Sequence, residues 1–559
     1  MRREVSIVNK KVCSFPILFA LLALLIGTCA VVFPASAQAV PTSTGSITVS
    51  GTVARSYDAY QIFSANVVDG DSDAKIATDL AWASDAVRDA ALPVLHSAGM
   101  PNSQTTAQEA AEWLNADSHL TSALSAQLAR SLQSSDAVPL NAGTASELPC
   151  GYWLIVADDD SIAQGEAGTA PVMALVGGSA VTVKPKAATP KVVKHVLKDS
   201  TAAWQKAADA TVADDLYWRL SATVPAGLTA YDTYTVQFVD TMSAGLDPSK
   251  VAASMHVYVA AGADGDFDAV STSKDGRVGT DPAKGWTDIT AQCRVSVDGK
   301  TFTVRTDDLI AALGGADAFT AGARVVAVYN APLNSACNHG IAKGNPNEVY
   351  LRYPRSPLAD QSGDAGFTRT PSDDACAYTW DLALTKRGSD GDKPLAGAVL
   401  SITDDRGRTL SADGTWDAEG KATVTTGEDG RVTVSGVDSG KLEVREPKAP
   451  KGYTAFEGTR SVTVKAEGLD VDQVAAAKPK LTITAESPLR ADSADGSTGS
   501  LEASLINTPA GIPPSITTGG FMPSTGDMAM FTAAAVAVVG AALIVVALLV
   551  KRGGGSHKE

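Results

Sequence analysis

The sequence is poor in the residues from which most catalytic and metal-binding sites are built. Its 559 residues include only six histidines and six cysteines, and these are scattered along the chain. It contains no Cys-x-x-Cys or Cys/His spacing typical of zinc, no nucleophile–base set and no glycine-rich phosphate loop. We therefore expect no enzyme activity on an external substrate, no metal and no cofactor.

Positive charge and aromatic residues are also scarce. Lysine and arginine number 46 against 62 aspartates and glutamates, which gives a formal net charge of −16, and aromatic residues make up 6% of the chain. Because an acidic surface repels polyanions, nucleic acid is not an expected partner. A chain of this composition suits an extracellular β protein.

Long apolar runs occur only near the two ends. At the N-terminus, residues 14–32 are largely apolar and follow the basic residues Arg2, Arg3, Lys10 and Lys11. The sequences Ala35-Ser36-Ala37 and Ala37-Gln38-Ala39 then offer small-x-small cleavage sites. This order predicts a secretory signal peptide over residues 1–39, cleaved after Ala39 or, alternatively, after Ala37.

Removal of the leader leaves Cys150, Cys293, Cys337 and Cys376 in an oxidising exterior, where disulfides persist. Four cysteines allow three pairings, and the sequence does not choose among them. Because Cys293 and Cys337 lie in the second half of the middle predicted domain and Cys376 directly follows it, we expect a disulfide that involves Cys337.

The apolar run near the C-terminus, residues 528–550, is long enough to cross a bilayer as a helix. The basic pair Lys551-Arg552 follows it and should stay on the cytoplasmic side. Before the run stands Met522-Pro523-Ser524-Thr525-Gly526. This order resembles the LPxTG cell-wall sorting signal of Gram-positive surface proteins, with Met522 in place of the usual leucine. The resemblance implies that a sortase cysteine attacks the Thr525 carbonyl, cleaves before Gly526 and passes the protein to an amine. An ordinary single-span anchor is the alternative.

The residues between the two ends are enough for about three domains. Residues 40–186 combine alternating strand patterns with helical spacing over 74–95, 106–113 and 120–132, which predicts an α+β domain. Residues 187–375 and 376–509 alternate apolar and polar residues between Gly/Asp turns, as β-sandwiches do. Residues 510–521 form a spacer before the sorting signal at 522–559. The predicted fold class is mainly β: an α+β domain, two Ig-like sandwiches and one C-terminal transmembrane helix.

The last predicted sandwich carries a lysine, a glutamate and an asparagine on separate strands. Lys386 lies in Leu382-Ala383-Leu384-Thr385-Lys386, Glu446 ends Lys441-Leu442-Glu443-Val444-Arg445-Glu446, and Asn507 lies in Ser504-Leu505-Ile506-Asn507. Together with Leu395-Ala396-Gly397-Ala398, this segment resembles the CnaB-type domain of Gram-positive pilins and adhesins. The resemblance implies an intramolecular isopeptide bond between Lys386 and Asn507, assisted by Glu446.

Such a bond needs these residue types in an apolar interior. Burial disfavours the ammonium form of lysine, and the free amine is the nucleophile. A buried, protonated Glu446 can donate to the Asn507 side-chain carbonyl and polarise it. Attack on that carbon expels ammonia and leaves an amide. The alternative is that all three are exposed strand residues, as such residues usually are.

The middle predicted sandwich repeats this logic with an aspartate. Lys194 lies on its first strand, Asp240 at the end of Phe238-Val239-Asp240, and Asn347 in Asn345-Pro346-Asn347. The pattern resembles the isopeptide-forming domain of fimbrial major subunits, which implies a Lys194–Asn347 bond assisted by Asp240. Lys191 and Lys198 are rivals for the amine.

A polymer would also need an acceptor amine. Val181-Thr182-Val183-Lys184-Pro185-Lys186 is similar to the pilin motif, with Lys186 at the lysine position. Lys184 and Ala187 stand where that motif has tyrosine and asparagine, so Lys184 remains a rival and a plain basic linker an alternative.

Taken together, the chain resembles a sortase-assembled fimbrial (pilus) major subunit. The resemblance implies localisation on the surface of a Gram-positive bacterium, with sortase, identical subunits and peptidoglycan as partners, and minor pilins and host ligands as further candidates. The alternative is a wall-anchored adhesin or accessory pilin that binds a host ligand and does not polymerise.

Overall fold

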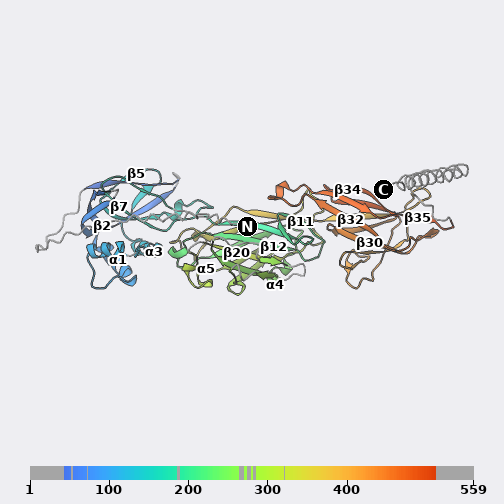
Figure 1. Cartoon of the computed structure of the whole chain (residues 1–559), viewed down its shortest axis with the longest axis horizontal. Coiled ribbons are helices and arrows are strands. Elements are labelled where there is room, and N and C mark those ends of the chain that lie inside the picture. The colour runs from blue at the N-terminus through green and yellow to red at the C-terminus, as the bar shows by residue number, and fades with distance from the viewer. Residues whose placement is uncertain are drawn as a thin grey trace, which may run out of the picture.

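The computed structural model describes residues 43–51, 55–71, 74–116, 118–185, 189–262, 270–272, 278–280, 285–319 and 322–511. The predicted signal peptide, spacer, sorting motif Met522–Gly526 and apolar run 528–550 lie outside the described residues, as does Lys186. Among the helices within these ranges, none has the length and apolar character needed to cross a membrane. The described parts follow one another along the long axis of an elongated molecule (Figure 1).

The N-terminal part combines two sheets with three helices, as the sequence predicted for an α+β domain. One sheet has the order β5-β1-β8, and the other has β3-β2-β6-β7 with β4 paired to β2. The helices are α1 (Asp85–Ser97), α2 (Ala107–Asn115) and α3 (Ser122–Leu132). The strands are β1 (Thr44–Val49), β2 (Ser56–Asp69), β3 (Lys75–Trp82), β4 (Val138–Asn141), β5 (Ala145–Pro149), β6 (Gly151–Ala157), β7 (Val172–Val176) and β8 (Val181–Val183).

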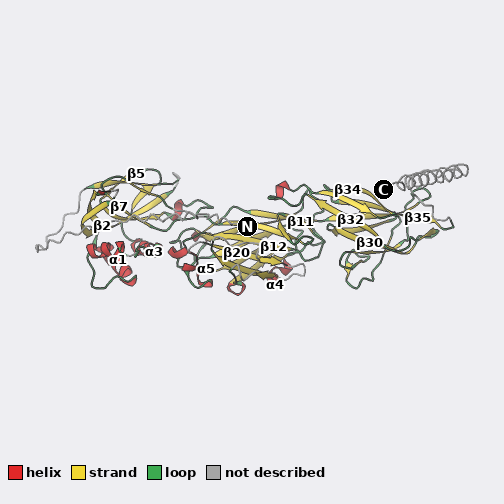
Figure 2. Cartoon of the chain, in the orientation of Figure 1, coloured by secondary structure: helices red, strands yellow, loops and turns green. Residues whose placement is uncertain are grey.

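Side-chain caps fix the starts of these helices. Ser84, Thr106 and Thr121 each accept a hydrogen bond from a backbone N–H of the first turn, and Thr106 forms a reciprocal capping box with Glu109. The apolar faces of all three helices pack on β2 and β6, in a core that includes Phe63, Leu128 and Leu154. The helices lie together on one side of this part of the molecule (Figure 2).

One predicted helix is partly wrong. The sequence indicated a helix over residues 74–95, but Lys75–Trp82 forms strand β3, which pairs antiparallel with β2, and the helix begins only at Asp85. Within Lys75–Trp82, Ala77, Leu80 and Ala81 stand at the three- and four-residue spacing of a helix. Pairing with the long neighbouring strand overrides that local preference.

The middle part is a sandwich of two sheets. One has the order β10-β9-β12-β20-β14-β17, and the other has β11-β23-β21-β13-β19-β18 with β22 paired to β21. Its strands are β9 (Lys191–Lys198), β10 (Ala203–Gln205), β11 (Ala207–Asp209), β12 (Tyr217–Val224), β13 (Val236–Met242), β14 (His256–Ala261), β17 (Trp286–Asp288), β18 (Cys293–Asp298), β19 (Thr301–Thr306), β20 (Ala323–Asn330), β21 (Asn345–Pro354), β22 (Phe367–Arg369) and β23 (Asp373–Tyr378). Two short helices, α4 (Val251–Ser254) and α5 (Leu309–Ala312), and a separate hairpin, β15 (Val270–Thr272) with β16 (Val278–Thr280), complete it.

The last part is a second sandwich. Its sheets have the orders β29-β24-β35-β31, with β34 paired to β35, and β27-β26-β25-β30-β32-β33, with β28 paired to β25. The strands are β24 (Trp380–Gly388), β25 (Val399–Thr403), β26 (Thr409–Leu410), β27 (Trp416–Asp417), β28 (Val424–Thr425), β29 (Arg431–Val437), β30 (Gly440–Lys448), β31 (Tyr453–Thr454), β32 (Arg460–Glu467), β33 (Lys480–Ala485), β34 (Leu489–Asp495) and β35 (Ser500–Pro509). The predicted mainly-β class is confirmed.

The alternation read from the sequence matches the burial of these strands. In β24, Leu382 and Leu384 are buried, while Asp381 and Ala383, which precede them, are only partly buried. In β20, Val325, Ala327 and Tyr329 belong to the core between the two sheets of the middle sandwich, whereas Val326 and Val328 are buried in a second cluster on the other face. Alternate residues of a strand point to opposite faces, so each sandwich draws its core from one face of every strand.

The cysteine prediction is wrong: Cys150, Cys293, Cys337 and Cys376 are all unpaired. Cys293 begins β18 and Cys376 lies on β23, with β21, β13 and β19 between the two strands. At about 4.8 Å per strand they lie roughly 19 Å apart, whereas a disulfide needs Cα atoms within about 7 Å. The Cys337 sulfur instead lies 3.5 Å from Nε2 of His339.

Candidate functional site

Both sandwiches bury the lysine, the asparagine and the acid that the sequence singled out. In the middle sandwich, Lys194, Asp240 and Asn347 are fully buried; in the last, Lys386, Glu446 and Asn507 are buried as well. Lysine and acidic side chains are almost never fully buried unless they are paired. The alternative that these are exposed strand residues is therefore wrong.

Lys194 is the only buried lysine of the three candidates on β9. Lys191 is exposed, and Lys198 is half-buried with its Nζ 3.7 Å from Asp209. Strand alternation explains the choice, because Lys194 shares the buried face of β9 with Val192 and Val196.

The middle cluster spans the two sheets. Lys194 comes from β9 in one sheet, whereas Asp240 and Asn347 come from the neighbouring strands β13 and β21 of the other. The Lys194 ammonium donates to Oδ2 of Asp240 in a very short contact. Any covalent bond between Lys194 and Asn347 would therefore join the two sheets through the core.

Tyr329 joins this cluster, although no sequence motif indicated it. Its hydroxyl accepts from Nζ of Lys194 at 2.9 Å and from Nδ2 of Asn347 at 2.8 Å, and donates to Oδ2 of Asp240 at 3.1 Å. The signal was present in the sequence: Tyr329 stands two and four positions after Ala327 and Val325, so on a strand all three point to the same face.

Burial shifts the ionisation of the middle cluster toward neutral forms. Removal from water lowers the pKa of Lys194 to about 8, although the nearby Asp240 carboxyl raises it. Burial also raises the pKa of the Asp240 carboxyl, although Lys194 lowers it. Among the described residues, Oδ1 of Asp240 and Oδ1 of Asn347 have no hydrogen-bond partner. A proton on Asp240 would give this pair of buried acceptors a donor.

The last cluster has a different arrangement. Lys386 on β24 and Asn507 on β35 lie on adjacent parallel strands of one sheet, where Lys386 is opposite Leu505. Glu446 reaches them from β30 in the opposing sheet. The Lys386 ammonium donates to Oδ1 of Asn507 in a very short contact and lies 3.3 Å from Oε1 of Glu446.

The carboxyl group of Glu446 faces the amide nitrogen of Asn507. Nδ2 of Asn507 donates to Oε1 and Oε2 at 2.9 and 3.0 Å, while the Asn507 oxygen faces the lysine. The sequence predicted that Glu446 would donate to the carbonyl oxygen. In this arrangement its carboxyl group lies next to the nitrogen that would leave as ammonia. Burial lowers the pKa of Lys386 to about 8, and Glu446 opposes that shift.

The candidate acceptor lysines lie at the end of the N-terminal part. Lys184 follows β8 and is exposed, whereas Lys186 lies outside the described residues. Groups of three or more residues suited to holding a metal ion do not occur in the described part of the chain.

Comparison with known proteins identifies a domain in the last sandwich. Residues 381–478 match the family described as SpaA, prealbumin-like fold domain, a segment that begins on β24 and contains Lys386 and Glu446. The chain is also 29% identical over 143 residues to the trypsin-resistant surface T6 protein of Streptococcus pyogenes serotype M6, and the match covers 24% of each chain.

Solved structures were compared as well. The T6 backbone pilin of serotype M6 Streptococcus pyogenes is 16% identical, with 84% of this chain and 99% of that chain covered and a TM-score of 0.46. The full-length major pilin SpaD from Corynebacterium diphtheriae is 15% identical, with 84% and 98% covered and a TM-score of 0.41. The domain match and the surface-protein relative confirm the resemblance that the sequence motifs indicated.

Proposed function

We propose that the chain is a structural subunit of a covalent surface pilus, built from three domains at residues 40–186, 187–375 and 376–509. The observation that carries this proposal is the presence of two buried Lys–Asn–acid clusters, one in each sandwich. A load-bearing fibre needs subunits that do not unfold under tension, and a covalent link through each core would provide that resistance.

In each cluster the chemistry is a self-directed amide exchange. The neutral lysine amine attacks the carboxamide carbon of asparagine, the tetrahedral intermediate collapses, and the amide nitrogen leaves as ammonia. The nearby acid takes the proton that the amine loses and returns a proton to the leaving nitrogen. Asp240 contacts the amine in the middle cluster, and Glu446 contacts both the amine and the amide nitrogen in the last.

Polymerisation would join the C-terminal sorting signal of one subunit to the segment between the N-terminal and middle domains of the next. Sortase would cleave between Thr525 and Gly526 and join Thr525 of one subunit to Lys186 of the next, and the completed fibre would be attached to peptidoglycan. The exposed Lys184 beside Lys186 supports an accessible acceptor segment at the end of the N-terminal domain.

Immunoblots of boiled wall extracts test the polymer. We expect a ladder of high-mass bands that disappears in Lys186→Ala and persists in the matched variant Lys184→Ala. A single monomer-sized band in the parent strain would favour the non-polymerising adhesin, and a ladder lost only in Lys184→Ala would move the acceptor to that residue.

Intact mass spectrometry tests the internal bonds independently of the polymer. The mature chain should be lighter than its sequence mass by two ammonia molecules, and fragment spectra should contain Lys194–Asn347 and Lys386–Asn507 crosslinked peptides. Peptides with unmodified Asn347 and Asn507 would contradict the proposal.

A further inference from the structure

Four arginines form a row across one face of the middle sandwich, outside the isopeptide clusters. The register places Arg294 opposite Arg305, and Arg305 opposite Gln237. It continues with Gln237 opposite Arg352, and Arg352 opposite Arg369. These five residues, here called the arginine row, cross β18, β19, β13, β21 and β22. At about 4.8 Å between strands the row is roughly 19 Å long.

This arrangement is electrostatically unfavourable within the protein itself. Like charges directly opposite one another on adjacent strands destabilise a sheet. Burial lowers the pKa of Arg305, and so do the nearby charges of Arg294 and Arg352. Two carboxylates offset part of the charge: Asp307 contacts Arg294 and Arg305, and Asp364 lies 2.7 Å from Arg352.

The compensation is incomplete at the β22 end. Asp364 is almost fully exposed, so its ion pair with Arg352 is weak. Arg369 forms no ion pair with any described residue; its guanidinium lies over the Tyr350 ring, 4.7 Å from the centroid, and beside the side-chain amide of Gln164. A protein with a net charge of −16 thus has a local excess of positive charge here.

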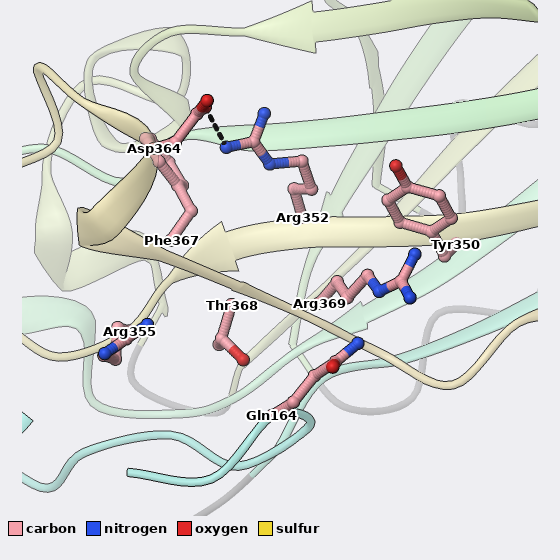
Figure 3. A pocket seen from close by; sticks show the side chains of 8 residues that line it. All are labelled: Gln164, Tyr350, Arg352, Arg355, Asp364, Phe367, Thr368 and Arg369. Atoms are coloured by element: carbon pink, nitrogen blue, oxygen red, sulfur yellow. Dashed lines mark hydrogen bonds and ion pairs between the residues drawn. The ribbon is translucent and has the colours of Figure 1, made fainter. Parts of the chain in front are cut away.

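A hollow of about 370 Å³ lies at this end of the row (Figure 3). Its lining residues are Gln164, Tyr350, Arg352, Arg355, Asp364, Phe367, Thr368 and Arg369. Arg355 donates to the backbone oxygen of Asp159 at 3.2 Å, and its Nε is buried with no hydrogen-bond partner among the described residues. The hollow therefore combines three guanidinium groups with two hydroxyls and an amide.

We propose that the hollow and the arginine row bind an acidic polysaccharide that carries carboxylate or sulfate groups. The planar guanidinium fork matches such oxyanions in a bidentate way, and the Tyr350 and Gln164 side chains can bond sugar hydroxyls. An acidic peptide offers carboxylates that arginine clusters also recognise, but it lacks the closely spaced hydroxyls that the Tyr350 and Gln164 side chains would bond. The proposal does not depend on polymerisation or on the internal bonds.

Binding of the full chain to immobilised heparin, which is sulfated, and to hyaluronan, which is carboxylated, tests this inference. Neutral dextran serves as the blank and polyglutamate as the acidic-peptide probe. We expect one or both glycans to bind and the Arg352→Gln/Arg369→Gln variant to lose roughly tenfold or more in affinity. The matched variant Arg431→Gln/Arg490→Gln removes two exposed, ion-paired arginines from the last sandwich and should bind as the parent does.

A charge-preserving variant separates recognition from folding. Arg352→Lys/Arg369→Lys keeps the net charge but loses the fork, and we expect weaker glycan binding with an unchanged melting temperature. Three results would overturn the proposal: no glycan binding by the parent, equal binding by the lysine variant, or tighter binding of polyglutamate than of either glycan.

Discussion

The two sandwiches place the same reactive pair in different geometries. In the middle sandwich the lysine belongs to one sheet and the asparagine to the other, and Tyr329 bonds to all three members of the cluster. In the last sandwich the lysine and asparagine lie on adjacent parallel strands, and the acid comes from the facing sheet. One bond would hold two sheets together; the other would hold the first and last strands of its domain side by side.

This difference shows what the chemistry requires and what it leaves free. Both clusters share burial of the amine, a lysine pKa lowered to about 8 and a carboxyl group in contact with that amine. Strand order, sheet membership and the identity of the acid all differ. A desolvated amine next to a carboxamide and an acid is therefore the common element, and either sandwich topology can provide it.

The largest effects should come from removing each crosslink. Lys194→Met would open a loop of roughly 150 residues and Lys386→Met one of roughly 120, and by analogy with disulfides each should cost about 5 kcal/mol of unfolding free energy. We expect the larger loss for Lys194→Met, because Asp240 then keeps only the Tyr329 hydroxyl, whereas Glu446 keeps the Asn507 amide and the Phe456 backbone N–H. Calorimetry in the presence of reductant measures the loss of unfolding free energy in both variants.

The mass of each variant provides the control. Each lysine substitution should restore one ammonia and leave the other bond intact, because the two clusters lie in separate cores. If Lys194→Met changes the mass only by the difference between the two side chains, no bond existed at that site in the parent.

The tyrosine offers a test that applies to one cluster alone. Tyr329→Phe removes the hydroxyl that bonds Lys194, Asp240 and Asn347. We expect slow or incomplete bond formation in the middle sandwich, seen as a mixed population by intact mass, and full formation in the last. Loss of a buried hydrogen-bonding group should also cost about 1–3 kcal/mol. Complete crosslinking at the parental rate would show that Tyr329 only fills space.

The pH dependence of an unreacted cluster tests the lysine environment. In Asn507→Ala, Lys386 keeps its amine, with a folded pKa of about 8 against about 10.4 in an unfolded chain. Between these values the unfolded chain holds a proton that the folded chain has lost, so unfolding free energy should rise with pH, by about 2 kcal/mol from pH 8 to 10. Below pH 8 Lys386 is protonated in the folded protein as well, and the free energy of unfolding is lowered by the full cost of burying its charge.

Other groups titrate in the same range, so the measurement needs a reference. Lys386→Met/Asn507→Ala lacks this amine and is otherwise matched. We expect the difference in stability between the two variants to narrow as pH rises. A difference that stays constant would mean that the Lys386 amine keeps its ordinary pKa in the folded protein.

Much of the fold could be read from local patterns. Alternating residues such as Leu382 and Leu384 identify strands, and the capping threonines before α2 and α3 identify helix starts. The residues of both clusters were also visible, because flanking motifs accompany them. The helix expected over Lys75–Trp82 failed because pairing with β2 is not a local property.

Other features depend on register between distant strands. The expected disulfide, which was to involve Cys337, is absent, and strand order also separates Cys293 from Cys376. The arginine row arises only when five strands align, and its members are up to 132 positions apart in sequence, from Gln237 to Arg369. Tyr329 likewise acquires its role from strands in the opposing sheet. No one-dimensional pattern contains that information.

The smallest expected effect concerns the joint between the two sandwiches. Arg408 of the last sandwich makes two contacts with Asp214 of the middle one, at 2.5 and 2.9 Å, and Gly436 approaches Val212 so closely that a Cβ would lie 2.4 Å from its Cγ2. Arg408→Gln removes the bidentate pair, which is partly exposed, and should cost about 1 kcal/mol. Because the cores are separate, both crosslinks should still form.

We expect calorimetry of Arg408→Gln to resolve the unfolding of the two sandwiches into more widely separated transitions, with an unchanged intact mass. The control variant Arg431→Gln removes an ion pair inside the last sandwich and should not separate the two transitions. Loss of either crosslink in Arg408→Gln would mean that the clusters depend on the joint and that the two sandwiches are not independent units.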